Sequence, residues 1–331
     1  MSMADPTLAP TGSEPKTHNH LIGNLPALQQ ALDRDGYWFF RDVLDKDAVA
    51  RFRKIYTDEL EAVGAIDPVG DTSTAGSVRP GRGQPSIDVN LISGMPFSRS
   101  SVWRSFVEDK PIHDFLVRLL GEEPFWKPSA VYRTTPPRPE SAANRITGYH
   151  QDGPSNPGIE FITMWVPIAE IDRDVGGIIF AEGLTDHVNR HRIDEHGSNK
   201  GIAPENLPAE RLRHTTYRPG DALFLNCWTP HSGLTNISDR FRLSLDQRIV
   251  RPGTPRPYVG EVLAIAPDRI EIRDDSGVTD TVRIVETSYT RATANDVLRG
   301  QDLVDALPPG TRVIVAHDQG VATLIRPTHQ E

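Results

Sequence analysis

Residues 217–250 decide the fold, and their sequence is YRPGDALFLNCWTPHSGLTNISDRFRLSLDQRIV. The stretch contains two short runs, the largely apolar 222–226 and the mixed 242–250 with apolar residues at 243, 245, 249 and 250, and each follows turn residues such as Pro, Gly, Asp and Ser. Short runs of this kind between turns predict β-strands. His231 comes just after the first predicted strand, so the chain places an imidazole near the end of a strand.

Further strands of the same kind precede this stretch. They are rich in Val, Ile, Phe and Trp, and we predict them at residues 125–134, 161–168 and 177–181. Nearer the amino terminus, apolar residues at helical spacing predict helices that begin near residue 25 and after Asp45, and another over 112–120, with a short buried strand at 36–40. Short strands separated by turns favour an antiparallel barrel or sandwich over alternating β-α-β units. We therefore expect a mainly β domain with flanking helices over residues 21–257.

A Pro-rich run, RPGTPRP at residues 251–257, resembles a linker and is followed by sequence of a different character. Residues 258–331 contain 12 acidic residues, 7 arginines and no lysine. We expect them to form a small β-rich C-terminal domain with one helix near 294–307 and strands at 262–265, 269–273, 281–285, 313–316 and 322–325. Three roles stay open for it: a surface for homodimer formation, a wall of the substrate pocket, or a docking module for a carrier protein.

Composition narrows the class of protein. The chain has 331 residues, a formal net charge of −9 and 37% hydrophobic residues, and no apolar run approaches the length of a membrane helix. The acidic balance argues against a nucleic-acid binder, which needs clustered Lys and Arg. The single cysteine, Cys227, excludes an intramolecular disulfide. Residues 1–20 are polar, lack the apolar core of a secretion signal and are predicted to be a disordered tail. We expect a cytoplasmic protein.

Three residues have the types and spacing of a metal site. His150 and Asp152 are two positions apart, and on a strand this spacing puts both side chains on the same face. His231 follows 79 positions after Asp152 and can come from a neighbouring strand. Two imidazoles and one carboxylate on one face of an octahedral ion leave three positions open, as in non-haem Fe(II) oxygenases. The alternative is that the His-x-Asp spacing is coincidental.

Arg242 supports the interpretation of these three residues as a metal site. It lies 11 residues after His231 on the next predicted strand. A guanidinium near an iron site can hold the carboxylate of a dicarboxylate co-substrate with two parallel hydrogen bonds. Ser244, two residues further on, would lie on the same face of the strand and would add a hydroxyl donor.

These residues resemble those of the phytanoyl-CoA dioxygenase-like family of Fe(II)- and 2-oxoglutarate-dependent oxygenases. The resemblance runs from about Gly36 to Val250 and rests on DGYWFFRDVL at 35–44, His150-x-Asp152, Trp165, Gly176-Gly177, Pro219-Gly220-Asp221, His231 and Arg242. It implies a double-stranded β-helix, or jelly roll, with helices packed on one sheet. It also implies that His150, Asp152 and His231 bind Fe(II) and that Arg242 holds the distal carboxylate of 2-oxoglutarate, in a pocket lined by Trp165, Ser244, Thr163, Lys127 and Tyr132.

The carboxylate at Asp152 also distinguishes the chain from related halogenases, which have a small residue there so that chloride can bind iron. We expect an enzyme that uses Fe(II), 2-oxoglutarate and O2 to hydroxylate an unactivated C–H bond of a small specialised metabolite, with release of succinate and CO2. Desaturation, epimerisation or cyclisation by the same oxidant is an alternative. Two others are an iron oxygenase that needs no 2-oxo acid and a non-catalytic jelly-roll protein that binds a metal or ligand.

Two further segments are candidates for substrate contact. Residues 66–99 lack periodicity and are rich in Gly, Ser, Pro and Arg, which is typical either of a flexible surface loop or of a lid or substrate loop. In a lid or substrate loop, Arg79, Arg82 and Asn90 would suit an anionic or hydroxylated substrate. The family often has a Gly-Ser-His run where this chain has EGLTDH at 182–187, so the substrate is not transferable from the family. His187 is a tentative substrate residue, and the nearby His191 is expected on a solvated surface.

Overall fold

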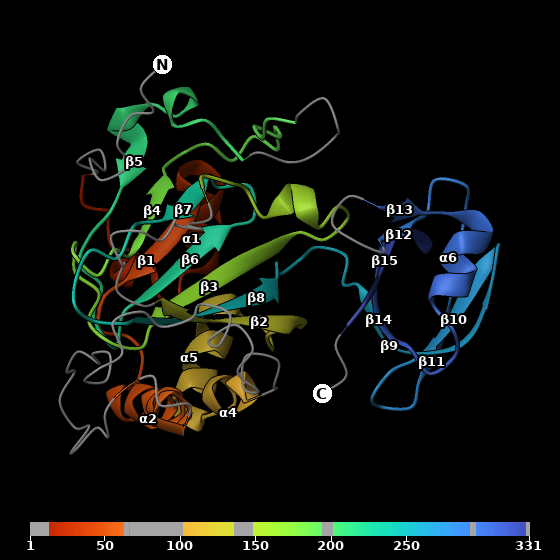
Figure 1. Ribbon diagram of the computed structural model, residues 1–331, viewed down its shortest axis with the longest axis horizontal. Helices are drawn as coiled ribbons and strands as arrows, with labels where there is room; N and C mark the ends of the chain where they lie inside the picture. Colours follow the sequence, from red (N-terminus) through yellow and green to blue (C-terminus); the bar gives the residue numbers. More distant parts are fainter. Residues whose placement is uncertain are drawn as a thin grey trace.

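A five-stranded antiparallel sheet forms the centre of the larger part of the molecule (Figure 1). The computed structural model describes residues 13–62, 66, 102–135, 148–193, 201–291 and 296–328. In spatial order, the sheet contains β1 (Tyr37–Phe40), β6 (Ala222–Asn226), β3 (Phe161–Pro167), β8 (Arg242–Val250) and β2 (Trp126–Thr135). Each of these five strands is predicted from the sequence, within one residue at its ends.

A second, smaller sheet faces the inner side of the first. Its order is β5 (Leu212–Arg213), β4 (Ile178–Ala181) and β7 (His231–Gly233), and His150 extends it by an antiparallel bridge to His231. Aromatic and aliphatic side chains of both sheets fill the space between them, including Tyr37, Trp165 and Phe180. Two antiparallel sheets closed over one core are the jelly roll that the sequence predicts.

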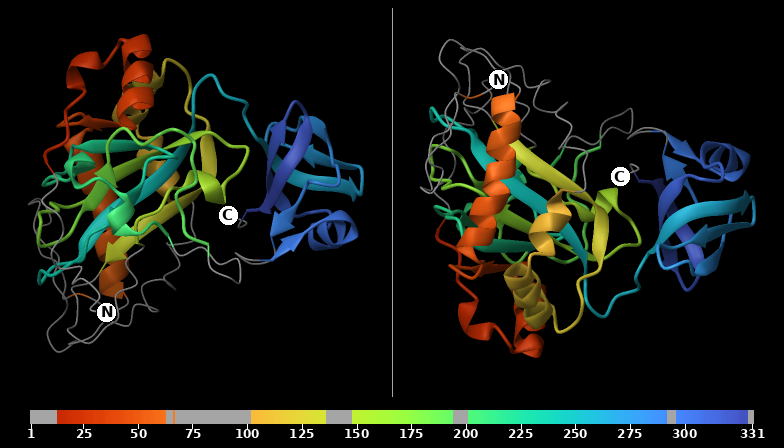
Figure 2. Two further views of the ribbon diagram at one scale, coloured as in Figure 1. Left: turned by 90° about the horizontal axis from the view of Figure 1, so that it is seen from above. Right: turned by 90° about the horizontal axis from the view of Figure 1, so that it is seen from below.

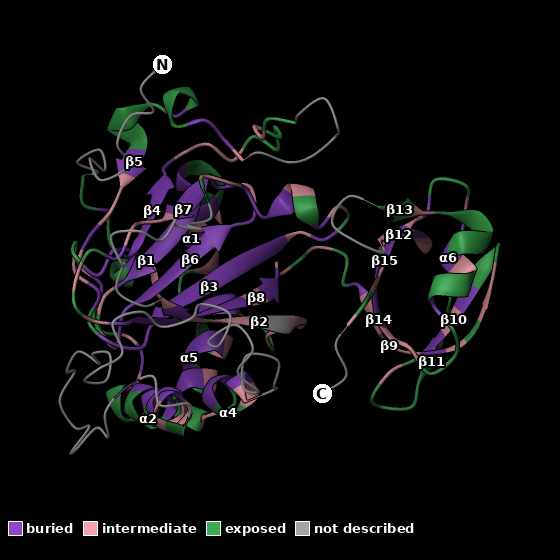
Figure 3. Ribbon diagram, in the orientation of Figure 1, coloured by how far each residue is buried: buried purple, intermediate pink, exposed green. Residues whose placement is uncertain are grey.

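Helices cover the other face of the five-stranded sheet, as Figures 1 and 3 show. They are α1 (Leu25–Asp35), α2 (Lys46–Ala62), α4 (Trp103–Val107) and α5 (Lys110–Leu120). Because side chains alternate along a strand, Leu243 and Leu245 of β8 pack against these helices. The intervening residues of β8, among them Arg242 and Ser244, face the inside of the jelly roll and are buried. The inner face of β8 thus places the polar side chains of Arg242 and Ser244 inside the jelly roll.

Local capping explains where the first helices begin. Asn24 Oδ1 accepts a hydrogen bond from Ala27 N at 3.3 Å, and Asp45 Oδ1 accepts one from Ala48 N at 2.8 Å. Side chains of this type satisfy backbone N–H groups that the first turn leaves without partners.

Single-turn 3₁₀ helices occur at η1 (Asn19–Leu21), η3 (Gly153–Ser155), η4 (Pro204–Asn206) and η5 (Ala209–Arg211).

The C-terminal segment forms a closed five-stranded barrel with its own apolar core (Figure 2). The strands are β9 (Tyr258–Ala266), β10 (Arg269–Arg273), β11 (Thr279–Arg283), β14 (Arg312–Asp318) and β15 (Val321–Pro327). A short sheet of β12 (Thr290–Arg291) and β13 (Val297–Leu298) and the helix α6 (Gly300–Ala306) complete it. The expected β-rich appendage with one helix is confirmed.

The barrel packs directly on the jelly roll. One buried cluster contains Phe161 and Cys227 from the jelly roll together with Ile314, Ala316 and Leu324 from the barrel. A Cβ built on Gly158 would lie 2.5 Å from Thr323 Oγ1, so the backbone of the jelly-roll loop approaches β15 closely. The contact brings the barrel beside the segment that carries Asp152.

Residues 13–20 differ from the disordered tail expected for residues 1–20. Ser13 forms a parallel bridge with Arg213, and His18 is buried, with its backbone N–H donating to Phe39 O at 2.8 Å. Lys16 forms an ion pair with Glu182 at 3.1 Å. The polar composition concealed this contact because the residues attach to the domain through hydrogen bonds rather than through apolar side chains. Within the described ranges, none of the helices combines the length and apolar character needed to cross a membrane.

Candidate metal centre

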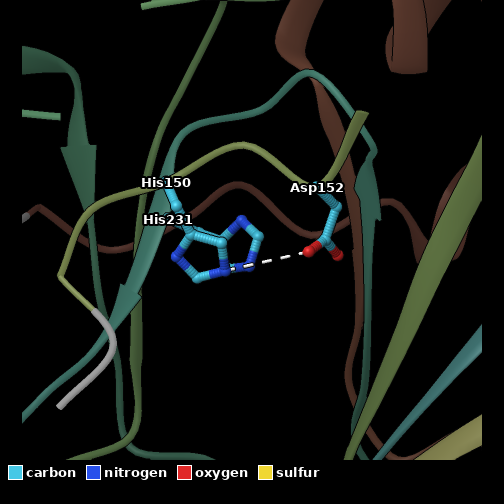
Figure 4. A group of neighbouring side chains, drawn as sticks. All are labelled: His150, Asp152 and His231. Atoms are coloured by element: carbon cyan, nitrogen blue, oxygen red, sulfur yellow. Dashed lines mark ion pairs between the residues drawn. The ribbon is translucent and has the colours of Figure 1, made fainter. Parts of the chain in front are cut away.

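His150, Asp152 and His231 converge on one point inside the jelly roll (Figure 4). One ligand atom from each residue lies within 4.8 Å of the others. The imidazole centroids are 4.3 Å apart, and His150 Nε2 lies 3.7 Å from Asp152 Oδ1. Asp152 and His231 are buried, and His150 is half-buried. Three potential ligand atoms on one side of a shared point leave the other side open for further ligands.

The backbone and the outer ring nitrogens hold both imidazoles in place. His150 N donates to His231 O and His231 N donates to His150 O, each at 2.9 Å. His150 Nδ1 lies 2.9 Å from Gly148 O, and His231 Nδ1 lies 3.0 Å from Thr229 O. Because a carbonyl oxygen only accepts, each Nδ1 carries the hydrogen and each Nε2 presents a lone pair. This is the tautomer that a metal-binding histidine needs.

Asp152 lies in a different backbone conformation from the one predicted. The His-x-Asp spacing predicts both residues on one strand, but Asp152 has helical backbone angles (φ −77°, ψ −31°) and directly precedes η3. Thr163 Oγ1 donates to Asp152 Oδ2 at 2.9 Å, and Arg248 Nη2 lies 3.4 Å from the same oxygen. These contacts leave Oδ1 directed at the histidines. The two side chains meet because the chain turns after His150, not because of strand alternation.

The protonation states of the site suit a divalent cation. Burial, with a further contribution from neighbouring His231, lowers the pKa of His150 to about 4, so its imidazole is neutral near pH 7. Burial alone would raise the pKa of Asp152, but Arg248, the two imidazoles and Thr163 outweigh it and hold that pKa well below its usual range. Metals bind deprotonated carboxylates and neutral imidazoles. The donor set therefore fits Fe(II) without a change of protonation at these two residues.

Gln151 supports the site in a way that the sequence alone does not indicate. Its backbone N–H donates to His191 Nε2 at 2.8 Å, and its side-chain Oε1 accepts from Arg190 N at 3.0 Å. Its Nε2 donates to Trp228 O at 2.7 Å and to Val188 O at 3.1 Å. Gln151 thus ties the His-x-Asp segment to residues 188–191 and to the loop before His231. The solvated surface expected for His191 is wrong, because that imidazole accepts a hydrogen bond from the backbone between the two candidate ligands.

Arg242 lies near the strand of His231. Its Nη1 donates to Gly176 O at 2.7 Å and to Leu234 O at 3.1 Å, and its Nη2 would lie 3.2 Å from a Cβ built on Gly233. Burial, followed by the charge of Arg133, lowers the pKa of Arg242 to about 10, so the guanidinium remains charged near pH 7. Among the described residues, neither Arg242 Nε nor Ser244 Oγ has a hydrogen-bond partner, although both atoms are buried. Buried donors without partners are uncommon and suit an anion such as a carboxylate.

The other residues predicted to line the 2-oxoglutarate pocket lie in different parts of the jelly roll. Trp165 packs against Tyr217 inside the jelly roll, with ring centroids 4.7 Å apart. Lys127 is buried and lines a cavity that Asp152 also lines. Tyr132 lies on the opposite, helix-covered face of its sheet, where its hydroxyl accepts from Trp103 N at 2.7 Å. The structure therefore does not bring Tyr132 to this site.

The tentative substrate residues are only partly described. His187 has a left-handed backbone conformation (φ 59°), and its ring stacks on Trp228 at a centroid distance of 5.0 Å. Its Nδ1 lies 3.8 Å from Glu160 Oε1. Arg79, Arg82 and Asn90 lie outside the described residues.

Comparison with known proteins identifies the family of the chain. The chain is 28% identical over 255 residues to the 1-deoxypentalenic acid 11-beta-hydroxylase of Streptomyces exfoliatus, covering 72% of this chain and 85% of that protein. Solved structures of the epimerase SnoN with Fe3+ and alpha ketoglutarate (TM-score 0.46, 23% identity, 69% and 84% of the two chains) and of the carbocyclase SnoK (TM-score 0.46, 19%, 72% and 87%) are also similar. The family model described as phytanoyl-CoA dioxygenase (PhyH) matches residues 32–244. The chain belongs to the phytanoyl-CoA dioxygenase family and is a non-haem Fe(II)- and 2-oxoglutarate-dependent dioxygenase.

Proposed function

We propose that His150, Asp152 and His231 bind the catalytic Fe(II) and that the enzyme hydroxylates a C–H bond of a small organic molecule. The observation that carries this proposal is the convergence of the three ligand atoms within 4.8 Å, with both imidazole Nδ1 atoms at hydrogen-bonding distance from backbone carbonyls. Iron held in this way supplies the oxidation, for which 2-oxoglutarate and O2 are the co-substrates and succinate and CO2 the co-products.

Arg242 is the proposed anchor of the co-substrate. Its buried Nε and the buried Ser244 Oγ offer two donors to the distal carboxylate of 2-oxoglutarate. Gly233 leaves space beside the guanidinium, since a Cβ there would lie 3.2 Å from Arg242 Nη2. Gly233 is two residues from His231 on β7, so this anchor lies beside one of the proposed ligands.

Thr163 orients a proposed ligand, and Trp165 helps to exclude water from the interior. Thr163 fixes Asp152 through its hydroxyl, and the apolar packing of Trp165 against Tyr217 closes the interior of the jelly roll. A dry interior strengthens the ionic contacts with the co-substrate. It also protects the oxidising site from solvent.

A small carboxylic acid is the substrate class that we propose. The relative from Streptomyces exfoliatus is named for hydroxylation of 1-deoxypentalenic acid, and its match covers 72% of this chain. Because the two proteins are 28% identical, the proposal extends to the class of compound and not to that particular acid.

Anaerobic titration tests the proposed site directly. Fe(II) and 2-oxoglutarate added together should produce a visible charge-transfer band with one equivalent of each per chain. His231→Ala should lose the band while keeping the unfolding transition of the parent protein. A normal band in that variant would refute the ligand assignment.

A further inference from the structure

A cavity of about 340 Å³ lies beside the proposed metal centre, where the jelly roll meets the C-terminal barrel. Lys127, Asp152, Asn156 and Arg248 of the jelly roll line it together with Ile314 and Arg326 of the barrel. Since Asp152 is a proposed iron ligand, a group bound in this cavity would lie beside that ligand. The barrel thus contributes part of the wall of this cavity.

Two hydrogen bonds connect the barrel to the segment that contains Asp152. Arg326 Nη1 donates to Asn156 Oδ1 at 3.1 Å, and Asn156 Nδ2 donates to the backbone oxygen of Asp152 at 2.9 Å. The apolar cluster that contains Phe161 and Leu324 lies in the same interface. Arg326 is therefore linked through one side chain to the backbone of a proposed ligand.

The lining of the cavity is rich in positive charge. Lys127, Arg248 and Arg326 are basic, whereas Asp152 is the single acidic residue among the described residues that line the cavity. Burial, followed by the charges of Arg248 and Arg326, lowers the pKa of Lys127 to about 7. Arg248 Nε is buried and has no hydrogen-bond partner within the described part of the chain. An anion that enters the cavity would stabilise Arg248, Arg326 and the protonated form of Lys127.

This cavity is distinct from the proposed anchor of 2-oxoglutarate. Arg242 and Arg248 point to the same face of β8 but are six residues apart, which separates their Cα atoms by about 20 Å at the rise of a β-strand. Arg242 contacts the loops next to β7, whereas Arg248 reaches Asp152. The two guanidinium groups therefore lie at different places along β8.

We propose that the cavity binds the carboxylate of the primary substrate and that Arg326 makes the C-terminal barrel a specificity-determining part of the active site. This inference rests on the proposed function, because it takes Asp152 as an iron ligand. It assigns the barrel the second of its three expected roles, a wall of the substrate pocket. The guanidinium of Arg326 and the cations of the jelly roll would hold the carboxylate while the remainder of the molecule extends towards the metal.

Benzoate and benzamide form a matched pair of probes, since they have nearly the same shape and differ in charge. Each is titrated by calorimetry into the full-length enzyme loaded anaerobically with Fe(II) and saturating 2-oxoglutarate. We expect benzoate to bind at least tenfold more tightly than benzamide. Arg326→Gln should weaken benzoate binding at least tenfold and leave benzamide unchanged, because a charge-assisted hydrogen bond is lost. Arg273→Gln, which removes a half-exposed barrel arginine paired with Glu261, is the control and should bind like the parent.

A second pair of variants keeps the test valid if Arg326→Gln does not fold. Ser155 is exposed and lines the same cavity. Ser155→Asp places a carboxylate among the cations and should weaken benzoate binding at least tenfold, whereas the neutral Ser155→Asn should not. Equal binding of benzoate and benzamide, no benzoate binding at 20 mM, or unchanged benzoate binding in Arg326→Gln or Ser155→Asp would each overturn the inference.

The visible band of the Fe(II)–2-oxoglutarate complex separates this inference from the proposed function. If benzoate removes the band, the anion site belongs to the co-substrate and the inference is wrong. If the parent protein forms no band before benzoate is added, the proposed function itself fails. A band that persists through the benzoate titration, together with a loss of benzoate affinity in Arg326→Gln, supports the inference.

Discussion

His150 and His231 exchange two backbone hydrogen bonds of 2.9 Å, although they are 81 residues apart in the sequence. The pair fixes the two Cα atoms at the edge of the smaller sheet, and Gly148 O and Thr229 O fix the two rings. The imidazoles are therefore oriented before any metal arrives. A preorganised site of this kind spends little binding free energy on ordering its ligands.

Asp152→Ala should abolish the tight binding of Fe(II). Of the three proposed ligands, the variant removes the one that is a carboxylate, and it leaves Arg248 beside two imidazoles. We expect the dissociation constant for Fe(II) to rise at least 100-fold and hydroxylation to stop. Anaerobic Fe(II) titration measures the first effect and succinate release the second. Asp58→Asn, at an exposed carboxylate paired with Lys54, is the control. Full turnover by Asp152→Ala would contradict the ligand assignment.

Thr163→Val should weaken the site without removing a ligand. It deletes the hydroxyl that donates to Asp152 Oδ2 at 2.9 Å and keeps the shape of the side chain. Loss of a hydrogen bond to a metal ligand typically costs about 10- to 100-fold in metal affinity. We expect an increase in the Fe(II) dissociation constant within that range, measured under the same anaerobic conditions, and restoration of most of the affinity in Thr163→Ser. Affinity equal to the parent in Thr163→Val would show that Arg248 alone orients the carboxylate.

Arg242→Ala should act on 2-oxoglutarate rather than on iron. The buried guanidinium is the proposed partner of the distal carboxylate, and hydrogen bonds to charged groups contribute roughly 1.5–3 kcal/mol. The 2-oxoglutarate dissociation constant should therefore rise at least tenfold, while Fe(II) binding without co-substrate stays within twofold. Arg240→Ala is a close control, since Arg240 pairs with Asp172 near the surface. Unchanged 2-oxoglutarate affinity in Arg242→Ala would show that another residue holds that carboxylate.

The metal-free protein should lose stability as the pH falls from about 6.5 towards 4. Burial, with His231 as a second cause, lowers the pKa of His150 to about 4, whereas the unfolded chain binds this proton near pH 6.5. Between these values the unfolded state holds more protons, so acid favours unfolding, at up to ~1.4 kcal/mol per pH unit from this residue. Urea unfolding at pH 7.0 and 5.0 measures the loss, which should be smaller in His150→Gln. Asp152, whose pKa is lowered, acts at more acidic pH, below about 4. An equal loss in parent and variant would exclude His150 as its source.

The sequence predicted the convergence of the ligands better than the reason for it. Turn signals and apolar runs located β3 and β8, and these strands carry Thr163 and Arg242 to one interior. The three-residue strand that contains His231 is too short to show a period, so it was not predicted. Lys127 and Tyr132 were placed in one pocket, although their separation of five positions puts them on opposite faces of β2. The contact through Gln151 and the contribution of Arg326 depend on residues far apart in the chain, which single-sequence patterns do not reveal.

Cys227 provides a test of whether the barrel stays docked on the jelly roll. It is the single cysteine of the chain, it is buried, and it belongs to the apolar cluster shared with Ile314 and Leu324. Burial, followed by the nearby charge of Glu160, raises the pKa of its thiol well above the usual value, and a protonated, covered thiol reacts slowly with disulfide reagents. In the native enzyme, labelling should be at least 100-fold slower than in 8 M urea.

Ile314→Asp places a charge in that interface and should separate the barrel from Cys227, because an unpaired buried charge is strongly unfavourable. Labelling of Cys227 should accelerate at least tenfold under native conditions, and benzoate binding should weaken in parallel, since Arg326 would leave the cavity with the barrel. Ile314→Val keeps the interface apolar and should label like the parent. Fast labelling with unchanged benzoate affinity would show that the anion site is complete without the barrel, whereas slow labelling in Ile314→Asp would show that other contacts hold the barrel in place.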